Sequence, residues 1–114
     1  MDTSHLLVKL TNRAEELRCE SAETKDLRNP VQLDQQSVGR LSRADALQVQ
    51  AMAVEVERRR SSELKEISSA LNRIASGEYG ECRVCGETID VARLDVIPTA
   101  TVCIGCADLP VDNN

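Results

Sequence analysis

Two stretches of the chain repeat small or apolar residues at alternating steps of three and four, the spacing that places side chains on one face of a helix. The first repeat comprises Leu7, Leu10, Ala14, Leu17, Ser21 and Thr24. Thr3 or Ser4 can cap its start, and the helix should end near Arg28 because Asn29 precedes a proline. We therefore predict a helix over about residues 3–28.

The second repeat is longer and opens with Ser42 and Asp45, a variant of the capping box. Its apolar line consists of Val49, Met52, Ala53, Val56, Leu64, Ile67, Leu71 and Ile74. No glycine or proline interrupts it before Gly77, which predicts a helix over about residues 42–76 and a tip loop over 29–41. Two narrow stripes predict an antiparallel coiled-coil hairpin over residues 1–77, with its better apolar seam at the base.

Residues 78–114 follow a different pattern, in which turn residues alternate with short β-branched runs. Residues 95–102 predict a small β-hairpin or a pair of short strands. The tail over 109–114 should be frayed. The chain is thus predicted to be mainly α, a long helical hairpin followed by a small finger module, residues 78–114, with short β-hairpin elements.

Four of the five cysteines stand in the finger as two Cys-x-x-Cys pairs, Cys82 with Cys85 and Cys103 with Cys106. Seventeen residues separate the pairs, a spacing typical of four-cysteine zinc sites. Thiolates three residues apart can point from one tight turn at the same ion, and two such turns complete a tetrahedron. We therefore predict one Zn²⁺, with Gly86 and Gly105 supplying backbone freedom to the turns.

Three other kinds of site share part of this pattern. A rubredoxin-like iron site would use the same ligands, but a single aromatic residue, Tyr79, offers little cover for an electron-transfer centre. A dithiol redox motif prefers a βαβ setting around one cysteine pair, and no such pattern is present. A catalytic zinc site keeps one position open for water. Because four thiolates fill four positions, the predicted zinc is structural.

The charge distribution bears on the partners of the chain. The net charge of the 114 residues is −5. Residues 78–114 hold seven acidic and two basic side chains, whereas residues 1–77 hold twelve of each, so the excess acidity belongs to the finger. Phosphate contact by the finger, and sequence-specific DNA binding with it, is therefore disfavoured.

Other classes of protein are disfavoured by what the sequence does not contain. With one histidine and no evident pair of catalytic carboxylates, we expect no enzyme. The start of the chain has no basic leader, and its apolar run of three residues is too short for a membrane span. We therefore expect a cytoplasmic protein without membrane contact.

The sequence around the cysteines resembles the DksA/TraR-type C4 zinc fingers of bacteria. The resemblance rests on YGECRVCG at 79–86, ARL at 92–94 and PTATVCIGC at 98–106. It implies a transcription regulator that binds RNA polymerase directly. In this family a coiled-coil tip enters the secondary channel of the polymerase, often together with guanosine tetraphosphate, without reading DNA sequence.

The tip is where the sequence departs from that family. Members that act in the channel carry an Asp-x-x-Asp-x-Ala turn, and counting back from the finger places its positions on Gly39, Ser42 and Ala44. Only the alanine is kept, and the nearby acidic residues are Asp34 and Asp45. Asp34, Ala44 and Asp45 are therefore the candidate tip residues. The alternative function is a zinc-stabilised adaptor between proteins, without activity in the polymerase channel.

Overall fold

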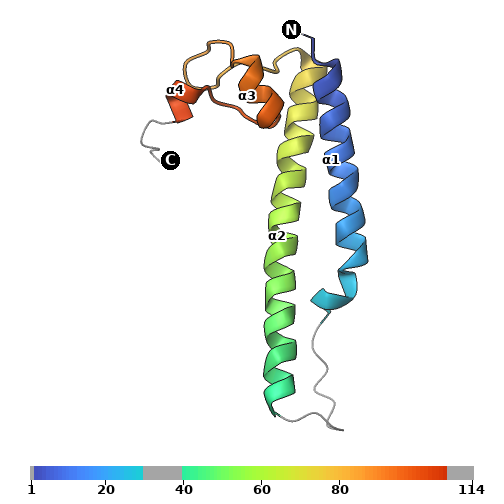
Figure 1. The fold of residues 1–114 in the computed structure, drawn as a ribbon. Coiled ribbons are helices and arrows are strands. Elements are labelled where there is room, and N and C mark those ends of the chain that lie inside the picture. Colours follow the sequence, from blue (N-terminus) through green and yellow to red (C-terminus); the bar gives the residue numbers. More distant parts are fainter. Residues whose placement is uncertain (1, 30–39, 108–114) are drawn as a thin grey trace. The chain divides into compact units, whose positions relative to one another are not determined.

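The computed structural model describes residues 2–29 and 40–107 of the chain. Over these residues the elements are α1 (Ser4–Glu23), the 3₁₀ turn η1 (Lys25–Arg28), α2 (Arg40–Ser76), α3 (Val91–Val96) and α4 (Ile104–Ala107), shown in Figure 1. The predicted mainly α class with a helical hairpin is confirmed. Most of the predicted tip loop, including Asp34, lies outside the described residues, and so does the whole tail.

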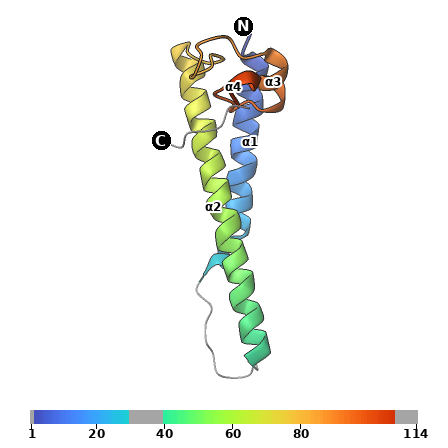
Figure 2. The ribbon, with the colours of Figure 1, turned by 90° about the vertical axis from the view of Figure 1, so that its left-hand side faces the viewer.

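The chain divides into two compact units, which do not follow the boundary predicted after residue 77. One unit combines residues 1–13 with 65–114, and the other consists of residues 14–64. In each unit a stretch of α1 lies beside a stretch of α2 (Figures 1 and 2). The first unit therefore holds the base of the helical pair together with the finger. No helix in the described part of the chain is both long and apolar enough to span a membrane.

The buried face of α1 differs by one residue from the predicted one at its start. Leu6 is buried and Leu7 is 43% exposed, whereas Leu10, Ala14 and Leu17 are buried as the pattern predicts. Two adjacent leucines satisfy the same helical spacing within one residue, so the sequence pattern alone could not choose between them.

The helix α1 ends before the predicted position and gives way to the 3₁₀ turn η1. The Thr24 hydroxyl donates to the backbone carbonyl of Glu20 at 2.8 Å, a local bond of the kind that often bends a helix. Arg28 donates from Nη2 to the Ser21 carbonyl at 3.1 Å and satisfies a terminal acceptor of the helix. Asn29 then has an extended backbone, as expected of a residue before proline.

The helix α2 begins at Arg40, two residues before the predicted capping box. Ser42 and Asp45 therefore both lie within the helix, and the box does not form its N-terminus. In the base unit Ile67 and Ala70 of α2 are buried. The apolar seam predicted near the base is thus observed there.

Beyond the buried Ala14 and Leu17, polar contacts join the two helices in the unit of residues 14–64. Glu57 accepts a hydrogen bond from the Ser21 hydroxyl at 2.7 Å and lies 3.2 Å from Nη1 of Arg28. Arg60, whose side chain is 16% exposed, pairs with Glu20 at 3.6 Å. This network explains why the apolar line of α2 is weak in its middle.

The apolar residues of α2 beyond this network are largely solvent-exposed. Val49, Met52 and Val56 are 50%, 62% and 43% exposed. Arg58 and Arg59 pair with Glu55 on the surface of the same helix, as expected for residues three and four positions apart. The outer part of the helical pair therefore buries little apolar surface in the part of the chain that the structure describes.

The strands predicted over residues 95–102 are not formed. Asp90 caps α3 by accepting from the backbone N–H of Ala92 at 3.1 Å, and the helix continues through Val96. A turn then follows at Pro98, so the β-branched residues of this stretch are divided between a helix and a turn. Between described residues the one β-type pairing is an isolated antiparallel bridge from Glu81 to Thr88.

We predict that Glu57→Gln lowers the free energy of unfolding by about 1–2 kcal/mol, because it weakens a half-buried interhelical network. The hydrogen bond from Ser21, followed by the charges of Arg28 and Arg60, lowers the pKa of Glu57 below 4.5. A carboxylate with a lowered pKa stabilises the fold above its unfolded pKa and loses this effect as pH falls through its folded pKa. The difference between wild type and variant should therefore narrow below about pH 4.5.

Urea unfolding at pH 7 and at pH 4 measures this difference, with wild type and variant compared at the same zinc content at each pH. Glu55→Gln is the matched control, because Glu55 is an exposed carboxylate of α2 that pairs with Arg58 and Arg59 on the same helix. It should have a much smaller effect. If both variants lowered the free energy of unfolding equally at pH 7, the interhelical network would stabilise the fold no more than a surface ion pair does.

Candidate metal centre

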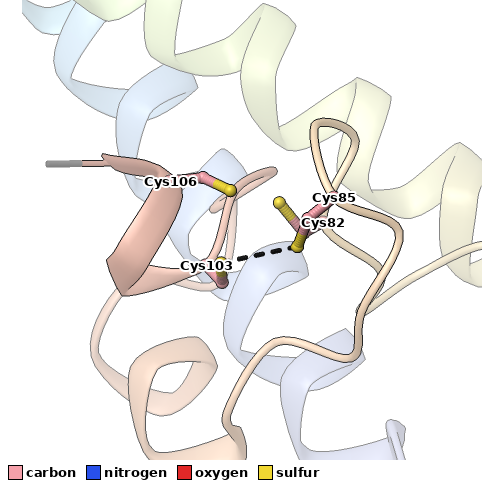
Figure 3. Close-up of side chains that lie close together, drawn as sticks. All are labelled: Cys82, Cys85, Cys103 and Cys106. Carbon is pink, nitrogen blue, oxygen red and sulfur yellow. Dashed lines mark hydrogen bonds between the residues drawn. The ribbon is translucent and has the colours of Figure 1, made fainter. Parts of the chain in front are cut away.

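Four cysteine side chains converge in the finger (Figure 3). The Sγ atoms of Cys82, Cys85, Cys103 and Cys106 all lie within 4.8 Å of one another. The Cys85 and Cys103 sulfurs are 3.8 Å apart. A tetrahedron with Zn–S bonds near ~2.3 Å has edges of about 3.8 Å, so the sulfurs are placed as the ligands of one zinc ion require.

The first pair of cysteines stands in a tight reverse turn. The Gly86 N–H donates to the Cys82 carbonyl and the Cys82 N–H donates to the Glu87 carbonyl, both at 2.8 Å. Gly86 has a φ of 76°, in the left-handed region where a side chain is strained. The isolated bridge from Glu81 to Thr88 closes this turn from outside. The glycine after Cys85 is thus required by the backbone, as predicted.

The second pair is held by a helical turn. Cys103 immediately precedes α4, Cys106 lies within α4, and the Ala107 N–H donates to the Cys103 carbonyl at 2.9 Å. Residues three apart share a face of a helix, which directs both sulfurs to the same side. Gly105 lies inside α4 without a positive φ, so the predicted need for glycine freedom there was wrong.

The thiols of Cys82 and Cys106 differ in how tightly they hold their protons. Hydrogen bonding from the backbone N–H of Cys85 lowers the pKa of Cys82 to about 6. A hydrogen bond with the Cys103 thiol, and further bonds within the cluster, raise the pKa of Cys106 to about 12. Crowded sulfurs cannot all ionise without a cation among them, and zinc requires thiolates. Zinc binding therefore releases protons and weakens as pH falls.

The fifth cysteine is separate from this cluster. Cys19 is exposed on α1, with its sulfur 3.8 Å from the Glu15 carboxylate. Ala44 and Asp45, two of the three candidate tip residues, are exposed near the start of α2. The third, Asp34, lies outside the described residues.

Sequence reasoning missed the side chains that support the second pair of cysteines. Arg93 donates from Nε to the backbone carbonyl of Val102 at 2.9 Å, and the Tyr79 hydroxyl donates to the Pro98 carbonyl at 2.7 Å. Both residues stand in the sequences that were noted for their resemblance to a family. Nothing in their spacing indicated these bonds, because they join residues nine and nineteen positions apart across an irregular stretch.

Comparison with known protein families identifies the finger. The profile described as "Prokaryotic dksA/traR C4-type zinc finger" matches residues 77–109. Together with the sulfur cluster this match confirms the prediction of one structural zinc ion. Four thiolates leave no position for water, so the ion organises the fold rather than acting on a substrate.

Curated relatives match the chain over part of its length. The "RNA polymerase-binding transcription factor DksA" of Haemophilus influenzae is 39% identical over 46 residues, which are 40% of this chain and 32% of that protein. An uncharacterized protein of Aquifex aeolicus is 35% identical over 75 residues, which are 66% of this chain and 48% of that protein. The matched regions thus span 32% and 48% of these two relatives.

A solved structure extends the likeness beyond the finger. The structure of transcription factor DksA2 from Pseudomonas aeruginosa matches with a TM-score of 0.76 and 29% identity, covering 93% of this chain and 80% of that one. The likeness therefore includes the helices as well as the metal centre.

We predict that Cys106→Ser abolishes stoichiometric zinc binding and loosens the finger, because structural sites of this kind supply much of the folding energy of small modules. Zinc content by mass spectrometry measures the first effect. The fluorescence of Tyr79, the single aromatic residue and only 8% exposed, measures the second. Cys19→Ser is the matched control and should retain one zinc per chain. Full zinc occupancy in Cys106→Ser would contradict this assignment.

Proposed function

We propose that this chain, which carries a zinc finger of the prokaryotic DksA/TraR type at residues 77–109, regulates transcription by binding RNA polymerase directly. The observation that carries the proposal is the shared architecture, because the likeness to the Pseudomonas DksA2 structure covers 93% of the chain. The Haemophilus relative, which matches over 46 residues, is named as an RNA polymerase-binding transcription factor. The finger would serve as a zinc-stabilised scaffold and the helices as the contacting element.

We further propose that the tip of the hairpin enters the secondary channel of the polymerase. Asp34, Ala44 and Asp45 are the residues assigned to this contact. Ala44 and Asp45 are exposed, which leaves them accessible to a partner. Because the usual pair of tip aspartates is replaced by Gly39 and Ser42, the two remaining carboxylates would have to act from other positions.

We propose a place for an anionic nucleotide such as guanosine tetraphosphate on the unit that holds the finger. A hollow of about 540 Å³ there is lined by four basic side chains, Lys65, Arg73, Arg83 and Arg93, with Glu66 among them. The Nη2 atom of Arg73 is buried without a hydrogen-bond partner among the described residues. We propose this hollow as the part of a polymerase interface at which the nucleotide would act.

The second candidate function is a zinc-stabilised adaptor that binds another protein without acting in the channel. The loss of both usual tip aspartates favours it. Neither function requires sequence-specific DNA binding, and the acidic finger disfavours it.

Binding to purified core RNA polymerase tests the proposed partner. We expect the zinc-loaded protein to co-elute with the polymerase in gel filtration and to leave duplex DNA free in a low-salt gel shift. Correctly zinc-loaded protein that does not bind the polymerase would refute the proposal. Tight binding to duplex DNA would favour a different class of regulator.

Transcription in vitro separates the two candidate functions. If the tip acts in the channel, the double variant Asp34→Ala/Asp45→Ala should keep polymerase binding and lose the effect on transcription. Glu55→Ala, an exposed acidic residue of α2, is the control and should act as wild type. An unchanged effect in the double variant would favour the adaptor. Parallel reactions with guanosine tetraphosphate, and with Arg73→Met, test the nucleotide hollow.

A further inference from the structure

The segment of residues 98–102 leads directly into the second pair of zinc ligands and has no regular secondary structure. Donors from three separate positions hold its carbonyl groups. The Tyr79 hydroxyl binds Pro98, the backbone N–H of Arg83 binds Thr101 at 2.9 Å, and Nε of Arg93 binds Val102 at 2.9 Å. The last of these carbonyls belongs to the residue immediately before Cys103.

We propose that Arg93 is a positioning residue for the zinc ligand Cys103, acting through its hydrogen bond to the Val102 carbonyl. A peptide group is planar, so an interaction that fixes the carbonyl of Val102 also fixes the nitrogen of Cys103. The direction from that nitrogen to the Cα atom sets where the cysteine side chain starts. Arg93 thus orients the ligand without touching the metal.

The helix that carries Arg93 is well anchored, which makes it a firm base for this task. Asp90 caps α3 at its start, and Leu94, the neighbour of Arg93, is fully buried. The Ile97 N–H donates to the Arg93 carbonyl at 2.8 Å and ties down its other end. A guanidinium held in this way presents its Nε–H along a defined direction, and a charged donor makes the stronger kind of hydrogen bond.

The geometry distinguishes the donor atom from the charge. The bond is made by Nε, which is the fourth atom of the arginine side chain when Cβ is counted as the first. In Arg93→Gln, the amide Nε2 occupies the same place along the side chain, so this variant keeps a donor and loses the charge. In Arg93→Lys a methylene occupies this place and the charge remains one atom farther out. Arg93→Met has neither a donor nor a charge.

Zinc affinity, measured by competition with a chromogenic chelator, tests the proposal on the full chain. Arg93→Met and Arg93→Lys should each bind zinc about 10–100-fold more weakly than wild type, the usual cost of losing a group that orients a ligand. Arg93→Gln should remain within about threefold of wild type, since it keeps the orienting donor. Cobalt substitution gives a second measurement, because the visible absorption of Co²⁺ reports the geometry of its four sulfurs.

The cobalt spectrum should change in the Met and Lys variants and stay unchanged in Arg93→Gln. Tyr79→Phe is the control for general support of the segment, since it removes a bond at Pro98, five residues before Cys103. It should lower stability and leave the cobalt spectrum unchanged.

If Arg93→Lys behaves as wild type and Arg93→Gln as Arg93→Met, the charge matters and the bond does not. If Tyr79→Phe alters the spectrum as Arg93→Met does, the role of Arg93 is general stabilisation. Either result overturns the proposal.

Should Arg93→Met fail to fold even with excess zinc, Arg93→Gln and Arg93→Lys alone still show whether the hydrogen bond or the charge is needed. Both measurements use zinc or cobalt alone and need no polymerase. Loss of the proposed polymerase function would therefore leave this inference standing, and failure of this inference would leave the polymerase proposal untouched.

Discussion

The convergence of four sulfur atoms on one point is the constraint on which the finger depends. Between described residues 78 and 107 the buried apolar side chains are Tyr79, Cys82, Ile89 and Leu94, one of which is itself a ligand. So few buried groups offset little of the conformational entropy that about thirty ordered residues lose. The metal, and the bonds that bring its ligands together, must supply the rest. This explains why irregular backbone is tolerated throughout the finger, since its turns are defined by the coordination sphere.

The helical part solves a different problem with different means. At its base the two helices meet through leucine, isoleucine and alanine, whereas farther along they meet through Glu57, Arg60 and their partners. Polar contacts that require particular partners stabilise less than apolar burial, but they specify which residues face each other. In the unit of residues 14–64, Glu57 and Arg60 of α2 pair with Ser21, Arg28 and Glu20, while Val49, Met52 and Val56 of α2 stay largely exposed.

The sequence was informative wherever the chemistry is local. Helical periodicity, the break before Pro30 and the paired cysteines each depend on residues a few positions apart, and each predicted the right kind of element. The errors arose where local signals compete. Leu6 and Leu7 fit the same apolar stripe. The β-branched residues within 95–102 predicted strands, although Asp90 caps a helix that begins just before them and the buried Leu94 anchors it. The bonds from Arg93 and Tyr79 could not be predicted, because they depend on how turns are folded against each other.

The contact between His5 and Asp95 has a consequence for the order in which the chain folds. These residues are 90 positions apart and their side chains lie 2.8 Å from each other, while Lys9 donates to the Asp95 carbonyl. The polar contacts between the helices in the other unit span about 40 positions or fewer. Closing the longer loop costs more entropy and waits on more of the chain. During synthesis the first turns of α1 thus emerge long before Asp95, and their contacts with the finger can form only after that residue has been made.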